Sequence, residues 1–204
     1  DLPFPQLAGI FRNFQRLRAV VPAAKARVQI AGGEPLLSDH LFPVMDLIAT
    51  AGYSLRLLTN GSLIDKTVAM EIKNHGCHVV QISLDGSAPT HERIRGKGQF
   101  QRVLEAARWL RERDVQVTFS MTLSAENVCD VGSVFETASR HADRVSFHRL
   151  VPCGRGAALK NKTLSRDDLR SAFETIQDLK ARYDPLEVPL RDPLWKPFLH
   201  CSPM

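Results

Sequence analysis

The chain has 204 residues, of which 44% are hydrophobic, 24% charged and 7% aromatic. This ordinary globular composition excludes a disordered tail, a collagen-like repeat and a disulfide-rich miniprotein. The net charge of +5 is scattered without an unbroken basic run, so we expect no nucleic-acid partner. No apolar run approaches the roughly 20 residues of a membrane span, and the first residues lack a signal-peptide pattern. We therefore expect a soluble, cytoplasmic protein without a membrane partner.

Five short segments rich in β-branched and apolar residues recur along the chain and predict strands. They are 26–31, 54–59, 78–84, 115–123 and 144–150. Several are nearly continuous apolar runs, as expected for parallel strands that are buried on both faces. The segments begin roughly 30 residues apart, which is the length of a unit in which a helix returns the chain to the start of the next parallel strand.

Apolar stripes at helical spacing lie before, between and after these strands. The predicted helical segments are 7–17, 38–52, 64–76, 100–110, 128–138 and 165–179. The first stripe consists of Leu7, Ile10, Phe11, Phe14 and Leu17. Ser38 is predicted to cap the second helix, and Ser165 with Asp168 three residues later predicts a capping box.

Alternating strands and helices predict an α/β fold, either an open doubly wound sheet or a partial barrel. The segment 184–204 differs because it is rich in proline. Proline at this density blocks regular strand ladders and helices. We expect an extended arm or the start of a second module there.

Polar residues and glycines follow the predicted strands. In parallel α/β folds, ligands bind at the carboxyl ends of the strands. Each motif by itself is typical of a turn, but five at one edge of a sheet favour a ligand site. The residues at these positions are Gly32, Gly33, Glu34, Thr59, Asn60, Ser83, Asp85, Ser120, Thr122, Asn127, Arg149 and Leu150.

The chemistry of these side chains allows a ligand role and a structural role. The glycine pair at 32–33 lets backbone approach a ligand closely. Glu34 either pairs with a cationic group such as an ammonium or complements the next helix dipole. Asp85 either accepts from hydroxyls or forms an Asp-Gly turn. Arg95, predicted to lie in a polar loop, either binds a carboxylate through two parallel hydrogen bonds or is solvated.

Together these motifs resemble a known family. Gly-Gly-Glu-Pro at 32–35, Thr-Asn-Gly at 59–61, and Ile-Ser-Leu-Asp-Gly at 82–86 followed by His91 and Arg95 resemble radical S-adenosylmethionine (SAM) enzymes. More narrowly, they resemble the SPASM-type peptide-modifying maturases, which carry a cysteine-rich C-terminal extension. The stretch 147–156 is similar to the last core strand and loop of that branch. The resemblance covers roughly residues 26–160.

The resemblance implies a partial (β/α)6 TIM-like barrel with parallel strands, whose first strand is absent from this chain. Residues 1–160 would form the core, 161–183 a helix closing it, and 184–204 an arm leading to a missing cysteine-rich extension. The CxxxCxxC motif that holds the family's [4Fe-4S] cluster is also absent. Truncation is the simplest explanation, and loss of the cluster is the alternative.

The resemblance also implies cofactors and the residues that bind them. The cofactors would be SAM and a [4Fe-4S] cluster, with auxiliary clusters in the missing extension. The glycine pair and Glu34 would hold the methionyl amino group, and Thr59 and Asn60 would line the floor. Ser83, Asp85 and Arg95 would lie near the ribose and carboxylate. The residues beside the nucleoside and adenine would be Ser120, Thr122, Asn127, Arg149 and Leu150. No catalytic residue or metal ligand is assigned within the chain.

The implied activity is generation of a 5′-deoxyadenosyl radical that abstracts hydrogen from a peptide or small protein. A flavodoxin or ferredoxin would be the reductant. Two alternatives stay open: a barrel without a cluster that acts as a binding or scaffold protein, and a metal-free lyase or aldolase. The candidate Schiff-base lysines of the latter are Lys66, Lys73 and Lys97, and none lies in a predicted strand, where burial would activate it.

The four cysteines match no zinc or cluster spacing, so we expect free thiols. Cys77 and Cys129 are predicted to be buried among apolar residues. Cys153 lies in the loop at the predicted ligand end. The resemblance implies that Cys201 is the first ligand of an auxiliary cluster.

Overall fold

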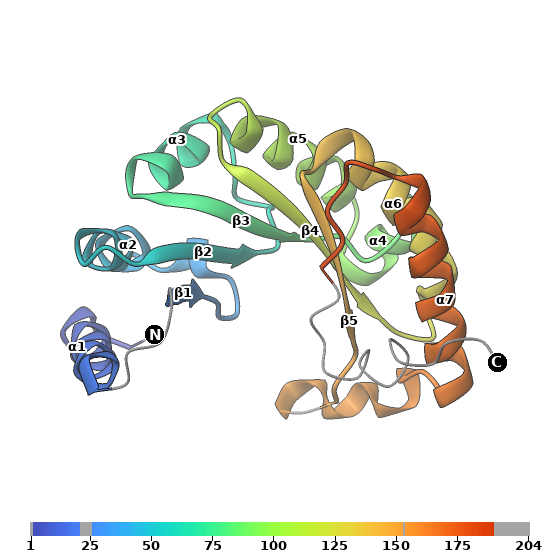
Figure 1. The fold of residues 1–204 in the computed structure, drawn as a ribbon, viewed down its shortest axis with the longest axis horizontal. Helices are drawn as coiled ribbons and strands as arrows, with labels where there is room; N and C mark the ends of the chain where they lie inside the picture. The colour runs from blue at the N-terminus through green and yellow to red at the C-terminus, as the bar shows by residue number, and fades with distance from the viewer. Residues whose placement is uncertain (1, 21–25, 153, 190–204) are drawn as a thin grey trace. The chain divides into compact units, whose positions relative to one another are not determined.

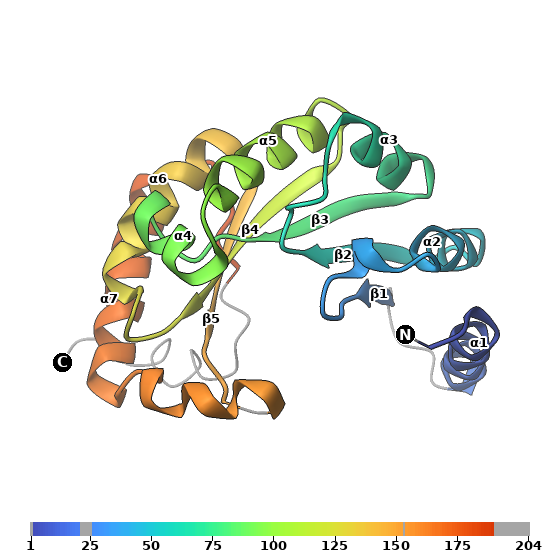
Figure 2. The ribbon, with the colours of Figure 1, turned by 180° about the vertical axis from the view of Figure 1, so that it is seen from behind.

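The computed structural model describes residues 2–20, 26–152 and 154–189. Strands and helices alternate along this part of the chain (Figures 1 and 2). The strands are β1 (Arg27–Ile30), β2 (Ser54–Thr59), β3 (Cys77–Ser83), β4 (Gln116–Leu123) and β5 (Arg144–Arg149). Each lies within about one residue of its predicted bounds, which confirms the apolar runs as strands.

The strands follow one another in the sheet in chain order, β1-β2-β3-β4-β5. The pairs β1–β2, β2–β3 and β4–β5 are parallel. A doubly wound sheet reverses its strand order at a switch point, whereas a (β/α) barrel adds strands in sequence. The order therefore decides between the two predicted architectures, and the fold is an α/β partial TIM-like barrel.

Helices follow or precede each strand. The α-helices are α1 (Phe4–Val20), α2 (Leu41–Thr50), α3 (Lys66–Asn74), α4 (Ala88–Arg95), α5 (Gln99–Arg111), α6 (Val131–His141) and α7 (Arg166–Arg182). Short 3-10 helices are η1 (Pro35–Leu37), η2 (Val128–Asp130) and η3 (Gly154–Lys162). The predicted capping box of α7 is confirmed, because Ser165 Oγ accepts from the Asp168 N–H and Asp168 Oδ2 accepts from the Ser165 N–H. Among the described helices, none is long and apolar enough to cross a membrane.

The chain divides into two compact units. The first contains Asp1–Ile82 and Glu105–Val117, and the second contains Ser83–Leu104 and Thr118–Met204. In the first unit, α1 and α2 lie side by side (Figure 1), and Ile48 and Leu57 are buried. In the second unit, α6 contacts both α7 and β5, and the rings of Phe135 and Phe147 stack with their centroids 5.2 Å apart.

The buried face of α1 differs from the prediction. Ile10 and Leu17 are 58% and 63% exposed, whereas Ala8 and Phe11 are buried. The ring of Phe11 packs edge-on against Tyr53, with centroids 5.6 Å apart. The side of the helix that carries Ala8 and Phe11 is therefore the packed one, and the stripe was wrong for Ile10 and Leu17.

Ser38 does not cap the second helix. Glu34 precedes η1 and Pro35 opens it, so the chain first makes a 3-10 turn and α2 begins only at Leu41. Ser38 ends that turn, and its Oγ accepts from the His40 N–H at 3.4 Å. The predicted cap lies two residues before the observed one, His40, because the prediction missed the separate turn.

The polar loop predicted around Arg95 is a helix, α4. Its first turn contains Pro89, whose fixed φ suits that position. Gly96 follows the last residue with a φ of +108°. Thr90 and His91 are buried on one side of the helix. The absence of an apolar stripe hid this helix from the periodicity analysis, and the Pro and Gly at its ends were the available signal.

The proline-rich segment begins against β5. The Val145 N–H donates to the Glu187 carbonyl at 3.0 Å, and the Glu187 N–H donates to the Asp143 carbonyl at 3.3 Å. Val188 is buried. Residues 184–189 thus pack on the second unit, and the rest of the predicted arm, 190–204, lies outside the described residues.

The cysteines divide by exposure. Cys77, at the start of β3, is buried as predicted. Burial raises the pKa of its thiol to about 11, although hydrogen bonds with the backbone of Val79 and Leu57 act against this. Cys129 is exposed, so the prediction of burial was wrong, because the residue lies in η2 before the packed face of α6 begins. Cys153 and Cys201 lie outside the described residues.

Candidate functional site

In the first unit, Glu34 links the segment after β1 to the end of β2. Its Oε1 accepts from Thr59 Oγ1 at 2.7 Å and from the Leu36 N–H at 3.2 Å. Its Oε2 accepts from the Asn60 N–H at 2.8 Å. Both oxygens of the carboxylate are thus held by the chain itself. We call Glu34, Thr59 and Asn60 the glutamate cluster.

The loop that carries Thr59 and Asn60 is itself well fixed. Buried Thr59 accepts from the Gly61 N–H at 3.0 Å through Oγ1, and Asn60 Oδ1 accepts from the Ser62 N–H at 2.8 Å. Gly61 has a φ of +80°, a left-handed conformation that glycine adopts without strain. Glu34 therefore has a structural role that differs from the predicted dipole complementation, because its carboxylate caps the short turn η1 and also anchors the β2 loop.

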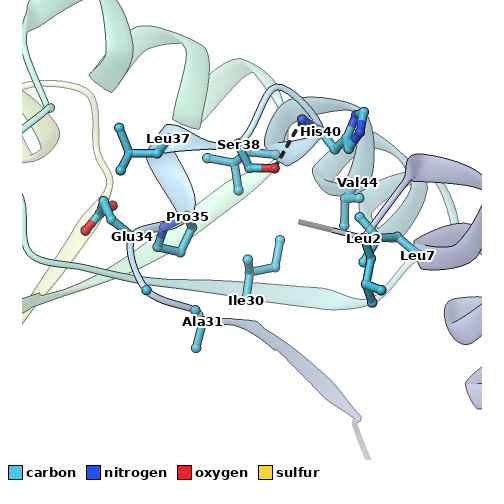
Figure 3. Close-up of a pocket in the computed structure, with 13 residues that line it drawn as sticks. Leu2, Leu7, Ile30, Ala31, Glu34, Pro35, Leu37, Ser38, His40 and Val44 are labelled. Carbon is cyan, nitrogen blue, oxygen red and sulfur yellow. Dashed lines mark hydrogen bonds between the residues drawn. The ribbon is translucent and has the colours of Figure 1, made fainter. Parts of the chain in front are cut away.

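The glycine pair stands in open space. A Cβ added to Gly32 or Gly33 would meet no atom within 4 Å. A cavity of about 510 Å³ adjoins the pair and continues toward α1 and α2 (Figure 3). Its wall is mostly aliphatic, with Glu34, Ser38 and His40 as polar members. Packing within the unit therefore does not require glycine at these positions, and the backbone stays accessible.

In the second unit, Asp85 follows the end of β3 with a side chain only 3% exposed. Its Oδ2 accepts from Arg95 Nε of α4 at 2.6 Å. Its Oδ1 accepts from the Thr122 N–H of β4 at 3.1 Å. A charged acceptor and a charged donor at this distance make a strong hydrogen bond. The buried carboxylate is thereby paired, as a buried charge must be.

His91 holds the backbone of the same turn. The Asp85 N–H donates to His91 Nδ1 at 3.1 Å, so Nδ1 must present a lone pair and the ring carries its proton on Nε2. Burial lowers the pKa of His91, the nearby charge of Asp85 opposes this, and Arg95 lowers the pKa further. The imidazole is therefore neutral near pH 7. Sequence reasoning named His91 within the motif without giving it a role.

Asn127 connects this turn to β4. Its Nδ2 donates to the carbonyls of Asp85 and Thr122, both at 3.0 Å, and its Oδ1 accepts from the Ser124 N–H at 2.8 Å and Ser124 Oγ at 3.1 Å. The residue is 1% exposed, and its amide makes four hydrogen bonds to the chain. We call the set Asp85, His91, Arg95, Thr122 and Asn127 the aspartate cluster.

A second carboxylate supports α4. Asp130 Oδ2 accepts from the N–H and Oγ of Ser87, at 3.2 and 2.9 Å. Burial raises the pKa of Asp130, but hydrogen bonds from Thr90 and Ser87 outweigh it, so the pKa lies below its ordinary value. A Cβ on Gly86, where φ is +150°, would lie 2.8 Å from Asp130 Oδ2. Sequence reasoning missed this contact, which joins residues more than 40 positions apart.

The remaining predicted residues lie at strand ends. Ser83 ends β3, and the carbonyl of buried Ser120 accepts from the Leu84 N–H at 2.9 Å. Arg149 ends β5, and the Leu150 N–H donates to the Leu123 carbonyl at 3.0 Å. The structure thus groups many of the predicted residues into one cluster in each unit. The predicted residues outside the two hydrogen-bonded sets are Gly32, Gly33, Ser83, Ser120, Arg149 and Leu150.

The residues that the structure describes do not fit an iron–sulfur cluster. Within the part of the chain that the structure describes, no group of three or more His, Cys, Asp or Glu side chains is placed to hold a metal ion. The sequence holds four cysteines and no CxxxCxxC motif. We therefore assign no cluster ligand to this chain.

Known proteins resemble the chain in sequence and in fold. Fe-coproporphyrin III synthase of Methanosarcina barkeri (strain Fusaro / DSM 804) is 31% identical over 151 residues, which are 73% of this chain and 38% of that protein. The mycofactocin maturase MftC of Mycobacterium ulcerans (strain Agy99) is 30% identical over 132 residues, 64% of this chain and 34% of that protein. The chain spans somewhat more than a third of the length of these curated relatives.

A solved structure shares the fold. The crystal structure of Streptococcus suis SuiB bound to precursor peptide SuiA superposes with a TM-score of 0.76 at 17% identity, covering 97% of this chain and 45% of that chain. In sequence, residues 9–138 match the radical SAM superfamily. The match covers more than half of the chain and includes the residues of both clusters. The chain belongs to the radical SAM superfamily.

Proposed function

We propose that the whole protein is a SPASM-type radical SAM enzyme that abstracts hydrogen from a peptide or small protein, and that this chain is its SAM-binding core. The family match over residues 9–138 carries the proposal. The relative named mycofactocin maturase MftC, at 30% identity, and the fold shared with SuiB, which was solved with a precursor peptide, support a peptide substrate. SAM and a [4Fe-4S] cluster are the cofactors of the superfamily, and SAM supplies the 5′-deoxyadenosyl group.

The glutamate cluster suits the ammonium of SAM. The Glu34 carboxylate is ready to accept from a cation, because Thr59 Oγ1 and the Asn60 N–H already fix its orientation. The backbone beside it is open, since a Cβ on Gly32 or Gly33 would meet nothing within 4 Å. We assign the ammonium to Glu34 and the glycine pair. Thr59 and Asn60, at the end of β2, orient the Glu34 carboxylate through these hydrogen bonds.

The aspartate cluster suits the carboxylate and the nucleoside. Arg95 has a guanidinium, which binds carboxylates in pairs of parallel hydrogen bonds, and its side chain is 37% exposed. We assign the SAM carboxylate to Arg95. The hydroxyl side chains of Ser83, Ser120 and Thr122 are assigned to the ribose side, with Arg149 and Leu150 bordering the adenine. Asn127 supports these groups through the hydrogen bonds that it makes to the Asp85 and Thr122 carbonyls.

The residues of this chain bind and orient SAM in this proposal, and no acid–base step is assigned to them. Because the sequence holds no CxxxCxxC motif, we assign these residues no step through a cluster. We propose a flavodoxin or ferredoxin as reductant and the cytoplasm as location.

The test is formation of 5′-deoxyadenosine. The whole protein, prepared anaerobically with iron and sulfide, is incubated with SAM and either dithionite or reduced flavodoxin. We expect product in both cases, and a loss of about tenfold or more in Glu34→Gln and Arg95→Gln, because each removes a charged hydrogen-bond partner. Glu71→Gln, which changes a partly exposed carboxylate on α3, is the matched control and should retain activity.

The outcomes separate the alternatives. A whole protein that takes up iron but forms no 5′-deoxyadenosine contradicts the proposal. A protein that takes up neither iron nor SAM supports a binding or scaffold role. Trapping of a carbonyl substrate by borohydride on Lys66, Lys73 or Lys97 would support the lyase. The structure places Lys66 and Lys73 on α3 and Lys97 between helices, outside the strands.

A tetrapyrrole substrate is the second candidate. The relative with 31% identity over 151 residues is named Fe-coproporphyrin III synthase, and its match is longer than that to the maturase. Titration of the whole protein with Fe-coproporphyrin III, followed by the absorption of the porphyrin, distinguishes the two. A saturable spectral shift that is absent with a heat-denatured control favours the tetrapyrrole, and no shift favours the peptide.

A further inference from the structure

We propose that Asp85 is a positioning residue that fixes the guanidinium of Arg95. In this arrangement Arg95 contacts the carboxylate of the ligand, and Asp85 itself does not contact the ligand. His91 in turn fixes Asp85. This inference rests on the proposed function, since it takes the ligand to be SAM. It changes the role of Asp85, which the sequence resemblance places directly on the cofactor.

The exposure of the two charges supports this division. Asp85 has a side chain 3% exposed, whereas that of Arg95 is 37% exposed. Both oxygens of Asp85 accept from the chain, one from Arg95 Nε at 2.6 Å and the other from the Thr122 N–H at 3.1 Å. At this exposure the Asp85 carboxylate offers little surface that a ribose hydroxyl could reach. The accessible charge of the cluster is the guanidinium.

The geometry of the ion pair also suits an orienting role. A guanidinium presents five N–H donors in a rigid plane. Asp85 accepts from Arg95 Nε, and this hydrogen bond fixes the plane of the guanidinium. The two terminal nitrogens, Nη1 and Nη2, are then left to donate to the two oxygens of a ligand carboxylate. Arginine otherwise loses considerable rotamer freedom on binding a ligand. Holding the side chain beforehand lowers that cost.

His91 completes the arrangement from α4. Arg95 lies one helical turn after His91, so the two side chains lie on the same side of α4. His91 Nδ1 accepts from the Asp85 N–H at 3.1 Å, and its ring contacts Phe100 with centroids 6.1 Å apart. The helix therefore holds the Asp85 backbone with one residue and the Asp85 carboxylate with another. Asn127 holds the Asp85 carbonyl at 3.0 Å from the side of β4.

The first experiment is a double-mutant cycle on SAM affinity, measured by equilibrium dialysis with radiolabelled SAM and the whole protein. Asp85→Asn retains an acceptor for the Thr122 N–H but presents an amide to Arg95. We expect Arg95→Gln and Asp85→Asn each to weaken SAM binding about tenfold, and the double variant to bind no more weakly than Arg95→Gln. Two independent contacts would instead multiply to about a hundredfold.

The second experiment separates a hydrogen-bond role of His91 from a packing role. An asparagine oxygen occupies the place of Nδ1, whereas a glutamine oxygen corresponds to Nε2. We expect His91→Asn to keep SAM affinity within about twofold and His91→Gln to lose several-fold. In the Arg95→Gln background, His91→Gln should cause no further loss. A purely structural effect would lower the unfolding midpoint of both His91 variants and would weaken binding in that background too.

The two hypotheses fail differently. Unchanged SAM affinity in Arg95→Gln contradicts the proposed function of Arg95. If Arg95→Gln weakens SAM binding, the proposed function of Arg95 stands. The positioning role is nevertheless overturned if the losses of affinity in Asp85→Asn and Arg95→Gln multiply, or if Asp85→Asn has no effect on SAM affinity. If Asp85→Asn does not fold, the cycle of His91→Gln with Arg95→Gln decides, because it tests the same dependence from the other side of the turn.

Discussion

At the scale of single residues, the aspartate cluster joins a neutral imidazole to a buried ion pair. Protonation of His91 would remove the lone pair that the Asp85 N–H uses. It would also place a positive charge in a buried position near Arg95, although Asp85 and Glu92 would favour that charge. The balance lowers the pKa of His91 because burial is the largest cause. The hydrogen bond from the Asp85 N–H therefore forms when the His91 imidazole is neutral.

This protonation state predicts the pH dependence of stability. Below the ordinary pKa of 6.5, unfolded His91 binds a proton that the folded ring does not, so the free energy of unfolding falls as the pH drops from about 6.5 through the lower folded pKa. We expect urea unfolding to give a smaller free energy at pH 5.5 than at pH 7.5. In His91→Asn, which keeps the acceptor but cannot titrate, the decrease should be smaller. Equal decreases in both proteins would show that His91 does not contribute.

The space around Gly86 and around Gly33 predicts different effects of a substitution by alanine. Gly86→Ala places a Cβ 2.8 Å from Asp130 Oδ2 at a φ of +150°, so we expect a loss of about 1–3 kcal/mol in unfolding free energy. Urea unfolding measures this loss.

Gly33→Ala places a Cβ that meets nothing within 4 Å, so stability should change by less than about 0.5 kcal/mol while SAM affinity falls. Urea unfolding measures the stability of Gly33→Ala, and equilibrium dialysis measures its SAM affinity. A Gly33→Ala protein that binds SAM normally would contradict the assignment of Gly33 to the proposed site.

At the scale of elements, the sequence predicted what local patterns encode. The strands were predicted within about one residue because buried parallel strands are continuous apolar runs. Helix α4 was missed because its buried face carries Thr90 and His91 rather than an apolar stripe. The link from Glu34 to Thr59 joins residues 25 positions apart and has no periodic signal. The motifs thus located the candidate residues, whereas the hydrogen bonds that join these residues to one another could be found only in the structure.

The capping box of α7 gives a prediction at this scale. Ser165 Oγ accepts from the Asp168 N–H at 3.1 Å, and Asp168 Oδ2 accepts from the Ser165 N–H. Removing the hydroxyl in Ser165→Ala leaves a donor of the first turn without its partner, so we expect a loss of about 1 kcal/mol in unfolding free energy. Ser171→Ala, an exposed interior position of α7, is the matched control and should change little. Because alanine has a higher helix propensity than serine, a similar loss in both variants would show that the lost cap is not the cause.

At the scale of the whole molecule, each compact unit carries one of the two hydrogen-bonded clusters. The glutamate cluster is built from the ends of β1 and β2, and the aspartate cluster from the ends of β3 and β4 with α4. Each is fixed by hydrogen bonds within its own unit. The order of the motifs along the chain predicted that successive strand ends contribute residues to one ligand site, because each βα unit contributes one strand end. The hydrogen bonds that orient each side chain could not be read from that order.

Ligand binding then predicts a change in the stability of the whole molecule. A ligand that binds only the folded state raises the free energy of unfolding by about 2.7 kcal/mol at a hundred times its dissociation constant. At a fixed SAM concentration above that constant, each tenfold loss of affinity lowers this gain by about 1.4 kcal/mol. We therefore expect SAM to stabilise the wild type, and to stabilise Glu34→Gln and Arg95→Gln each by about 1.4 kcal/mol less, for a tenfold loss of affinity. Urea titrations with and without SAM measure this gain independently of turnover. A reduced gain in only one of the two variants would mean that a single cluster binds SAM, and the assignment of the other cluster would then be wrong.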